Sequence, residues 1–204
     1  MIVSESFYLD HDVLALARAL IGKLLVTEMD GLRTSGIIVE TEAYRAPEDR
    51  ASHAYGNRLT ERTKTMFMSG GHSYVYLCYG VHELFNVVTA TEGVPHAVLI
   101  RAVEPLQGLE IMFERRSLSE KQKYLLTRGP GSLSKALGID RSFNATPLYR
   151  EDSAVRIEDI GIRFAQDEIA SSKRIGVENA GESALWPWRY YVKSNPYVSG
   201  KKDL

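Results

Sequence analysis

The sequence has little of three features that would narrow its function at once: cysteine, an excess of charge of one sign, and long apolar runs. Its single cysteine, Cys78, excludes a disulfide within the chain and a zinc site built from several thiolates. It contains no apolar window of about 18 residues, and its N-terminus lacks the basic-then-apolar pattern of a secretory signal. We therefore expect a soluble protein of a reducing compartment, the cytoplasm, without membrane contact.

The near balance of charge gives no support to nucleic-acid binding by itself. Lys and Arg number 25 against 26 Asp and Glu, a formal net charge of −1. A chain of this balance binds DNA only if it gathers its cations on one face. The 204 residues, 44% of them hydrophobic, are enough for one domain with an apolar core, which we expect to span residues 1–204.

Hydrophobic periodicity predicts an α+β fold. Residues 12–22 carry apolar side chains at helical spacing, with Asp10 or His11 opening the helix and Gly22 ending it. Two β-rich runs around Asp30-Gly31 predict a hairpin. Further strands are expected over 72–80, 83–90, 97–103 and 189–192, and a loop followed by a strand within 146–159. A loop with a short helical turn is expected over 45–62, and helices from Pro105 onward over 106–116, 119–126 and 132–137. The pattern indicates a single mixed domain with a curved, mainly antiparallel sheet flanked by helices.

The stretch with the most unusual chemistry covers residues 37–54, IIVETEAYRAPEDRASHA. Strand side chains alternate between faces, so that one face carries Ile38, Glu40, Glu42 and Tyr44, and the other Val39, Thr41 and Ala43. A face with two acids and a tyrosine is no ordinary apolar core, because burying even an unpaired polar group costs roughly 2–7 kcal/mol. That face therefore meets water or lines a site. From the residues alone Glu40 and Glu42 are equal candidates, and a solvated or ion-paired face is the commoner outcome.

Four blocks carry a family resemblance: VETEAY, MFMSGGHSYVYLCYG, FNVV and LIRAVEPLQG. In this order they resemble the signature blocks of the alkyladenine (3-methyladenine) DNA glycosylases, and the match runs from about Leu14 to Val198. The resemblance implies a monofunctional enzyme of base-excision repair. Such an enzyme flips alkylated purines, 3-methyladenine and 7-methylguanine, out of duplex DNA and hydrolyses the N-glycosyl bond, leaving an abasic site. Hypoxanthine and ethenoadenine stay open as substrates.

The same resemblance implies the partners. It points to double-stranded DNA containing alkylated purines, to a monomer that in a bacterium is associated with the nucleoid, and to chemistry without a metal or cofactor. Two alternatives remain: a catalytically weak damage recogniser with the same pocket, and a structural or RNA-directed domain on the same scaffold. The joint presence of the site residues named below argues against the second.

The resemblance assigns the catalytic base to Glu42 and leaves Glu40 a structural role, anchoring a backbone donor or a cation. N-glycosyl hydrolysis passes through a sugar with oxocarbenium character. A nearby carboxylate can take a proton from water and stabilise that positive charge. Arg101 is implied to hold the water and the DNA backbone, and a guanidinium there can keep Glu42 ionised. Without the resemblance, Arg101 would be read as part of a sheet-edge salt bridge.

The implied base pocket is aromatic, because stacking worth about 1–3 kcal/mol per base offsets the cost of extrusion. A cationic alkylated purine gains further from electron-rich rings. The resemblance assigns Tyr44 and Tyr76 to stacking, His53 to the opposite wall as a donor to the nucleotide, Asn86 to exclusion of guanine, Ala51 and Leu99 to the lining, and Tyr79 to the wedge that fills the vacated gap. Without the resemblance, Tyr74, Tyr76 and Tyr79 would be read as sheet packing, and a lone histidine as a satisfied surface or core residue.

Contacts to the DNA backbone are assigned to Arg58, Arg128 and Lys135. They belong to a wider basic set with Arg62, Lys64, Arg115, Arg116, Lys121 and Lys123. Gly129-Pro130-Gly131 before a helix is a candidate phosphate site through free backbone N–H groups. The chain departs from the family pattern at Ser132, where lysine is common, and at Val81, where methionine is usual. These departures leave open how the protein contacts the DNA backbone and how the Tyr79 wedge packs.

Overall fold

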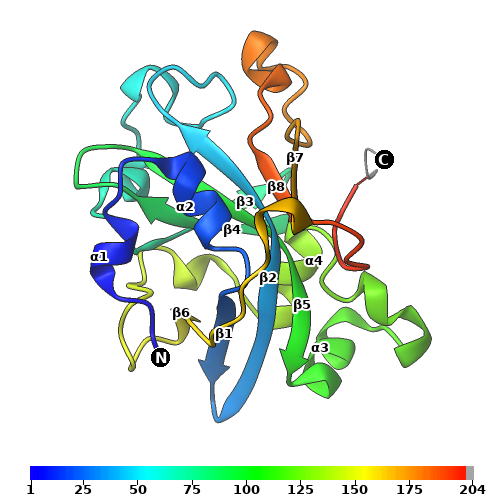
Figure 1. Cartoon of the computed structure of the whole chain (residues 1–204). Helices are drawn as coiled ribbons and strands as arrows, with labels where there is room; N and C mark the ends of the chain where they lie inside the picture. Colours follow the sequence, from blue (N-terminus) through cyan, green and yellow to red (C-terminus); the bar gives the residue numbers. More distant parts are fainter. Residues whose placement is uncertain (201–204) are drawn as a thin grey trace.

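The structure, a computed structural model, describes residues 1–200 and contains one open antiparallel sheet (Figure 1). Its eight strands are β1 (Leu24–Met29), β2 (Leu32–Arg45), β3 (Ser73–Cys78), β4 (His82–Thr89), β5 (His96–Gln107), β6 (Val155–Glu158), β7 (Ile169–Ser172) and β8 (Arg189–Val192). The main order is β3-β4-β5-β2-β1-β6, with β8 paired to β2 and β7 paired to β8. The predicted α+β class is confirmed. A single domain over 1–204 stays a prediction, and residues 201–204 lie outside the described part.

Short helices flank the sheet. They are α1 (Glu5–Tyr8), α2 (Val13–Ala19), α3 (Leu109–Arg116) and α4 (Pro130–Leu137), with 3-10 turns η1 (Tyr55–Asn57), η2 (Lys64–Phe67), η3 (Glu120–Leu125), η4 (Arg141–Phe143), η5 (Gln166–Glu168) and η6 (Gly181–Leu185). Helix α2 packs on β2 and β5, and α4 packs on β4 and β5. In Figure 1, α2 lies in front of the sheet and α4 behind it. Among residues 1–200, no helix combines the length and apolar character needed to cross a bilayer.

Two predicted boundaries were wrong for identifiable reasons. The first helix is capped by Asp12, whose carboxylate accepts from two backbone N–H groups at 3.0 Å, so it begins after Asp10 and His11. The predicted helix from Pro105 begins only after Gly108, because β5 continues to Gln107. Pro105 pairs with Gly36 of β2, beyond the last residue of β5 that pairs with β4. A proline is tolerated there because one side of the strand is an edge.

The hairpin between β1 and β2 forms as predicted, with Met29 opposite Leu32 and left-handed backbone at Asp30 and Gly31 (φ 50° and 75°). The long strand β2 then pairs with β5 with three register irregularities, one between Ser35 and Gly36 and two around Glu40. Its register passes from Ile38↔Val103 to Glu40↔Ala102 and on to Thr41↔Ile100, which leaves Val39 and Arg101 without direct partners. An unpaired residue of this kind re-aims its side chain. Arg101 is thereby turned toward the two acids of β2.

A small apolar cluster supports the loop after β2. It is separate from the main core and consists of Ala46, Ala54, Met66, Tyr74, Val88 and Ala97. Phe67 and Tyr76 pack against it. Residues from the loop, from η2 and from β3 to β5 therefore form one rigid wall, which carries the aromatic side chains described below.

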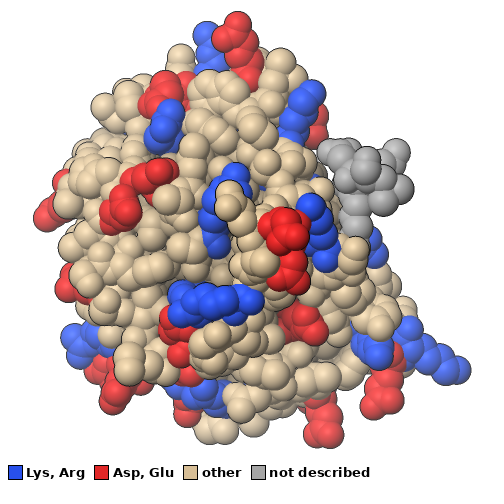
Figure 2. All heavy atoms as spheres, in the orientation of Figure 1, with Lys and Arg blue, Asp and Glu red and all other residues tan. Residues whose placement is uncertain are grey.

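Charge on the face shown in Figure 2 is mixed, with basic and acidic side chains interspersed over tan surface. Several cations of the predicted basic set also have partners within the chain. Arg115 donates to the carbonyl of Ala136 at 3.2 Å, and Arg116 donates to the carbonyl of Leu126 at 3.1 Å. Lys64 pairs with Glu61 at 2.6 Å. Contact of these residues with DNA stays a prediction.

The contribution of the Asp12 N-cap of α2 to stability can be tested by substitution. Asp12→Ala should lower the free energy of unfolding by about 1 kcal/mol, because two backbone N–H groups lose their acceptor. Asp12→Asn keeps the acceptor and should change it by much less. Urea denaturation measures both variants, and equal losses would show that the cap contributes nothing.

Candidate active site

The carboxylate of Glu42 is fully buried, and both of its oxygens have partners. Oε2 accepts from the hydroxyl of Tyr44 at 2.7 Å. Oε1 accepts from the backbone N–H of Ile175 at 2.7 Å and lies 3.2 Å from Nη1 of Arg101. A buried carboxylate is tolerated when it is paired and hydrogen-bonded in this way. The predicted adjacency of Glu42 and Tyr44 on one strand face is observed.

Glu40 is equally buried but has a different environment. Oε1 accepts from Nε of Arg101 at 3.0 Å, from Nε of Arg189 at 2.7 Å and from the hydroxyl of Ser199 at 2.9 Å. Oε2 accepts from the backbone N–H of Ser199 at 2.7 Å. Glu40 thus anchors cations and a backbone donor together, which is the structural role expected for it.

Arg101 joins the two acids. Its Nε binds Glu40, its Nη1 lies beside Glu42, and its Nη2 donates to the hydroxyl of Ser199 at 3.1 Å. Burial alone would lower the pKa of Arg101, but the charges of Glu42 and Glu40 raise it above its usual value. The guanidinium stays charged and compensates negative charge at both carboxylates.

A cavity of about 440 Å³ opens beside these groups, within the range of small-molecule sites. The three partners of the Glu42 carboxylate, Tyr44, Arg101 and Ile175, all line it. The carboxylate therefore lies one layer beneath the wall. The remaining lining comes from Ala51, His53, Arg62, Met66, Tyr74, Tyr76, Leu77, Cys78, Tyr79, Leu84, Asn86, Ala97, Leu99, Pro130, Gly176 and Val177.

The aromatic walls come from three segments. His53 meets Tyr76 edge to face, with ring centroids 4.5 Å apart, and Tyr74 lies 5.4 Å from Tyr76. Burial, and then the charge of Glu42, raise the pKa of Tyr44 well above its usual value. Tyr44 therefore stays protonated and donates to Glu42. Its predicted role was stacking, and this hydrogen bond is an additional one.

His53 is held between a tyrosine and an arginine. Its Nδ1 lies 2.9 Å from the hydroxyl of Tyr74, and its Nε2 lies 3.2 Å from Nη2 of Arg62. The guanidinium of Arg62 also lies 5.1 Å from the centre of the Tyr76 ring. Burial, and then the charge of Arg62, lower the pKa of His53 to about 4. Because guanidinium only donates, Nε2 is an acceptor here, and the donation to a nucleotide predicted for His53 requires Arg62 to move.

Most other predicted pocket residues meet at the same cavity. Asn86 is paired opposite Leu99 across β4 and β5, and its amide donates to the carbonyl of Tyr74 at 3.0 Å. Ala51 lines the loop wall. Tyr79 stands at the rim, 91% exposed, with left-handed backbone (φ 50°) at the β3–β4 turn. Val81 beside it is also exposed.

The turn before α4 reaches the same rim. Pro130 lines the cavity, and a Cβ added at Gly131 would lie 2.8 Å from the ring of His82, so the turn packs tightly against the β3–β4 hairpin. Arg128 is exposed but donates from Nε to the carbonyl of Val198 at 3.0 Å. Arg58 and Lys135 are exposed on the surface. Their contact with DNA stays a prediction.

Sequence reasoning missed the segment 174–177, which supplies the backbone donor to Glu42 and part of the cavity wall. It also missed Arg189 and Ser199 as partners of Glu40. The only local signal was Arg174 directly before the Ile-Gly-Val run, which has no periodicity of its own. Within the described residues, no group of three or more His, Cys, Asp or Glu side chains is arranged to hold a metal ion.

An acid beneath an aromatic-walled cavity, on an open α+β sheet, defines a candidate site for a flat ligand. Comparison with known proteins specifies the family. A family model described as methylpurine-DNA glycosylase matches residues 6–196. The chain therefore belongs to the methylpurine-DNA glycosylase family, which confirms the resemblance. The predicted class, a hydrolase of N-glycosyl bonds in DNA that serves DNA repair, is confirmed at this level.

Individual relatives agree along nearly their whole length. A protein of Chlamydia abortus is 48% identical over 188 residues, which cover 92% of this chain and 96% of the relative. A protein of Chlamydia pneumoniae is 45% identical over 199 residues, 98% of both chains. One from Bacillus cereus is 43% identical over 202 residues, covering 96% of this chain and 98% of the relative. Each carries the provisional name 3-methyladenine DNA glycosylase.

The buried acid Glu40 should contribute more to the free energy of unfolding than a strand glutamate that is paired at the surface. Glu40→Ala should lower the free energy of unfolding by about 3–5 kcal/mol, because it leaves Arg101 and Arg189 buried without a shared counter-charge. Glu83→Ala is the control: it is also a strand glutamate paired to an arginine, but Arg141 is exposed, so the loss should stay below about 1 kcal/mol. Urea denaturation of both variants decides, and similar losses would contradict the account.

His53 should titrate far below an ordinary histidine. Its folded pKa of about 4 lies below the usual 6.5, so the unfolded chain binds more protons between these values. The contribution of His53 to stability is therefore lost as pH falls from 6.5 toward 4. NMR of the imidazole should give a midpoint near pH 4, and Arg62→Gln should move it upward. An ordinary midpoint in the wild type would refute the buried, cation-flanked environment.

Proposed function

We propose that this protein hydrolyses the N-glycosyl bond of alkylated purines in duplex DNA, 3-methyladenine foremost, and leaves an abasic site. The observation that supports this most strongly is the buried Glu42 carboxylate, whose three partners all form part of the cavity wall. The family match and the names of the relatives favour the same reaction. In a bacterium the site of action would be the nucleoid, in the cytoplasm.

The carboxylate has one oxygen with spare capacity. Oε1 has two partners, the Ile175 N–H and Arg101, whereas Oε2 has only the Tyr44 hydroxyl. An ionised carboxylate offers about four lone-pair sites, so Oε2 can accept one more hydrogen bond. We assign the attacking water to Oε2. Arg101, which lines the cavity, would hold that water and the nearby phosphate backbone.

The reaction then needs only one proton transfer to the protein. The water oxygen bonds to C1′ of the extruded nucleotide and its proton passes to Oε2 of Glu42. The C1′–N9 bond breaks, and its electron pair leaves with the purine. The negative charge of Glu42 stabilises the oxocarbenium character that develops at the sugar. For a purine alkylated at N3 or N7 the base leaves neutral, so no acid is required.

The cavity favours such cationic bases. A purine lying between Tyr44 on one side and His53 and Tyr76 on the other would meet electron-rich rings, and its positive charge strengthens that contact. A neutral lesion such as hypoxanthine needs a proton on leaving. With a pKa of about 4, His53 is an uncharged imidazole at neutral pH and therefore a poor acid, and burial raises the pKa of Tyr76. Neither group suits the role of acid, so we infer a preference for alkylated purines.

Extrusion from the duplex would use the rim of the cavity. The exposed Tyr79 ring at a turn would occupy the gap left in the base stack, while Asn86 would narrow the pocket against the 2-amino group of unmodified guanine. Arg58, Arg128, Lys135 and the N–H groups at the start of α4 would contact phosphates without reading sequence. A monomer suffices for this mode of binding.

Replacement of the proposed base is the direct test of the function. Glu42→Gln should lower base release by about 10²–10⁴-fold, because an amide cannot accept the proton of water. Binding to duplex DNA that contains an uncleavable abasic-site analogue should persist. Chromatography of bases freed from methylated DNA measures the release.

Glu28→Gln, a strand glutamate outside the cavity, is the matched control and should release bases as the wild type does. Undiminished release by Glu42→Gln would remove Glu42 from the mechanism. A wild-type protein that binds methylated DNA but frees no base would instead be a damage recogniser.

A further inference from the structure

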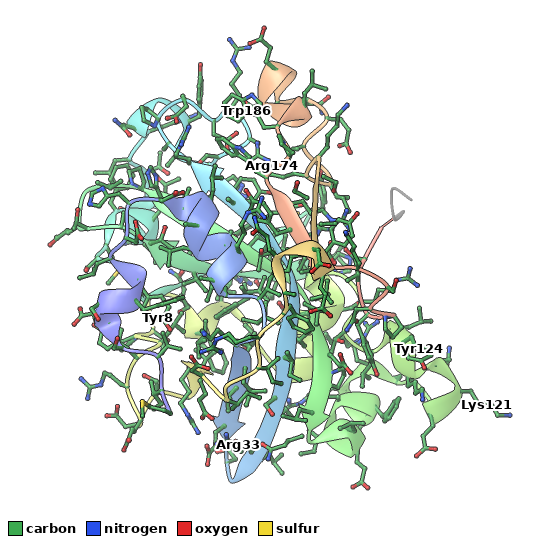
Figure 3. All side chains as sticks on the ribbon, viewed as in Figure 1. Tyr8, Arg33, Lys121, Tyr124, Arg174 and Trp186 are labelled. Carbon is green, nitrogen blue, oxygen red and sulfur yellow. The ribbon has the colours of Figure 1, made fainter. Side chains whose placement is uncertain are left out.

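Arg174 hydrogen-bonds to β2, to the loop after β2 and to η6, although it does not line the cavity. The residue lies shortly after β7 in the sequence, and its side chain is fully buried. Figure 3 shows it where the end of β2 meets the C-terminal segment that leads to Trp186. Both terminal nitrogens of its guanidinium are hydrogen-bonded within the protein, whereas its buried Nε has no hydrogen-bond partner among the described residues.

Its two terminal nitrogens make four hydrogen bonds to three segments. Nη1 donates to Asp49 Oδ2 at 2.5 Å and to the carbonyl of Ala43 at 2.9 Å. Nη2 donates to Asp49 Oδ1 at 2.8 Å and to the carbonyl of Ser183 at 2.9 Å. The fork of a guanidinium matches a carboxylate in this bidentate way, and an ammonium does not. Ala43 is the residue between Glu42 and Tyr44.

The guanidinium also contacts the ring of Tyr44, whose centre lies 4.7 Å from its central carbon. Tyr44 is the donor to Oε2 of Glu42 and a wall of the cavity. Asp49, in turn, accepts from the backbone N–H of Ala51 at 3.0 Å, and Ala51 also lines the cavity. Arg174 thereby contacts one lining residue directly and is linked to a second through one buried ion pair.

The residue after Arg174 completes the connection. Ile175 donates its backbone N–H to Oε1 of Glu42 at 2.7 Å, and the position of this N–H follows from the position of Arg174 in the chain. We propose that Arg174 is a positioning residue for the reaction: it holds the Ile175 N–H and the Tyr44 ring so that the Glu42 carboxylate faces the bound nucleotide. The proposal rests on the proposed function, since it assigns to Arg174 the geometry of that base.

A positioning role differs from a purely structural one in what it changes. A displaced carboxylate slows the chemical step, whereas the rim residues that grip DNA are untouched. Arg174→Lys keeps the positive charge but removes the paired hydrogen bonds from two nitrogens to the carboxylate of Asp49. The single-turnover rate of base release from DNA containing 7-methylguanine should fall by about a hundredfold. The dissociation constant for duplex DNA with an uncleavable abasic-site analogue should stay close to that of the wild type.

Arg156→Lys is the matched control. Arg156 is another buried arginine of the sheet, paired with Glu28 at 2.7 Å and Glu158 at 2.9 Å, outside the cavity lining. The Arg156→Lys variant should lower the midpoint of thermal unfolding as Arg174→Lys does, but it should keep the wild-type single-turnover rate of base release. If Arg174→Lys does not fold, Asp49→Asn carries the same test. Asparagine can still accept from the Ala51 N–H, but it presents no charge to Arg174.

The outcomes separate the two proposals. Arg174→Lys and Arg156→Lys with equal rates, or an unchanged rate with weakened DNA binding, would overturn the positioning role. Retained base release by Glu42→Gln would overturn the proposed base whatever Arg174 does. Loss of release in Glu42→Gln, together with slow chemistry and normal binding in Arg174→Lys, supports both.

Discussion

Charge compensation among four buried side chains is the constraint on which the rest of this structure depends. Glu40 and Glu42 are both fully buried on one strand, and Arg101 and Arg189 neutralise them within hydrogen-bonding distance. Removing any one partner would leave an uncompensated charge in a dry interior, which is far costlier than the net gain from a complete pair. The need to bring these groups together explains the paired irregularities of β2 and β5, which turn Arg101 toward the acids.

The two acids have separated roles because their donors differ. The Glu40 carboxylate already accepts four hydrogen bonds, two of them from guanidinium groups and two from Ser199. Glu42 retains capacity on Oε2 and lies beneath the cavity wall. The same residue type, two positions apart, thus serves stability in one case and is available for chemistry in the other. Environment, not residue identity, makes the distinction.

Local sequence patterns predicted what depends on near neighbours. The period of a strand places Glu42 beside Tyr44, and Asp30-Gly31 closes the first hairpin. Patterns failed where a partner lies far along the chain: Ile175 is 133 residues from Glu42, and Ser199 is 159 residues from Glu40. No periodicity marks those two donors, because their roles arise only when the C-terminal segment crosses the sheet. The carbonyl acceptors of Arg115 and Arg116 likewise come from other segments and had no signal in the sequence.

The central claim is that the cavity beside Glu42 holds a purine taken out of the duplex. A crystal structure of the Glu42→Gln variant with duplex DNA containing 7-methylguanine would test it most directly. The account predicts the damaged base between Tyr44 and the pair formed by His53 and Tyr76, with the Tyr79 ring in the vacated stack. A damaged base still stacked in the helix, above an empty cavity, would contradict it.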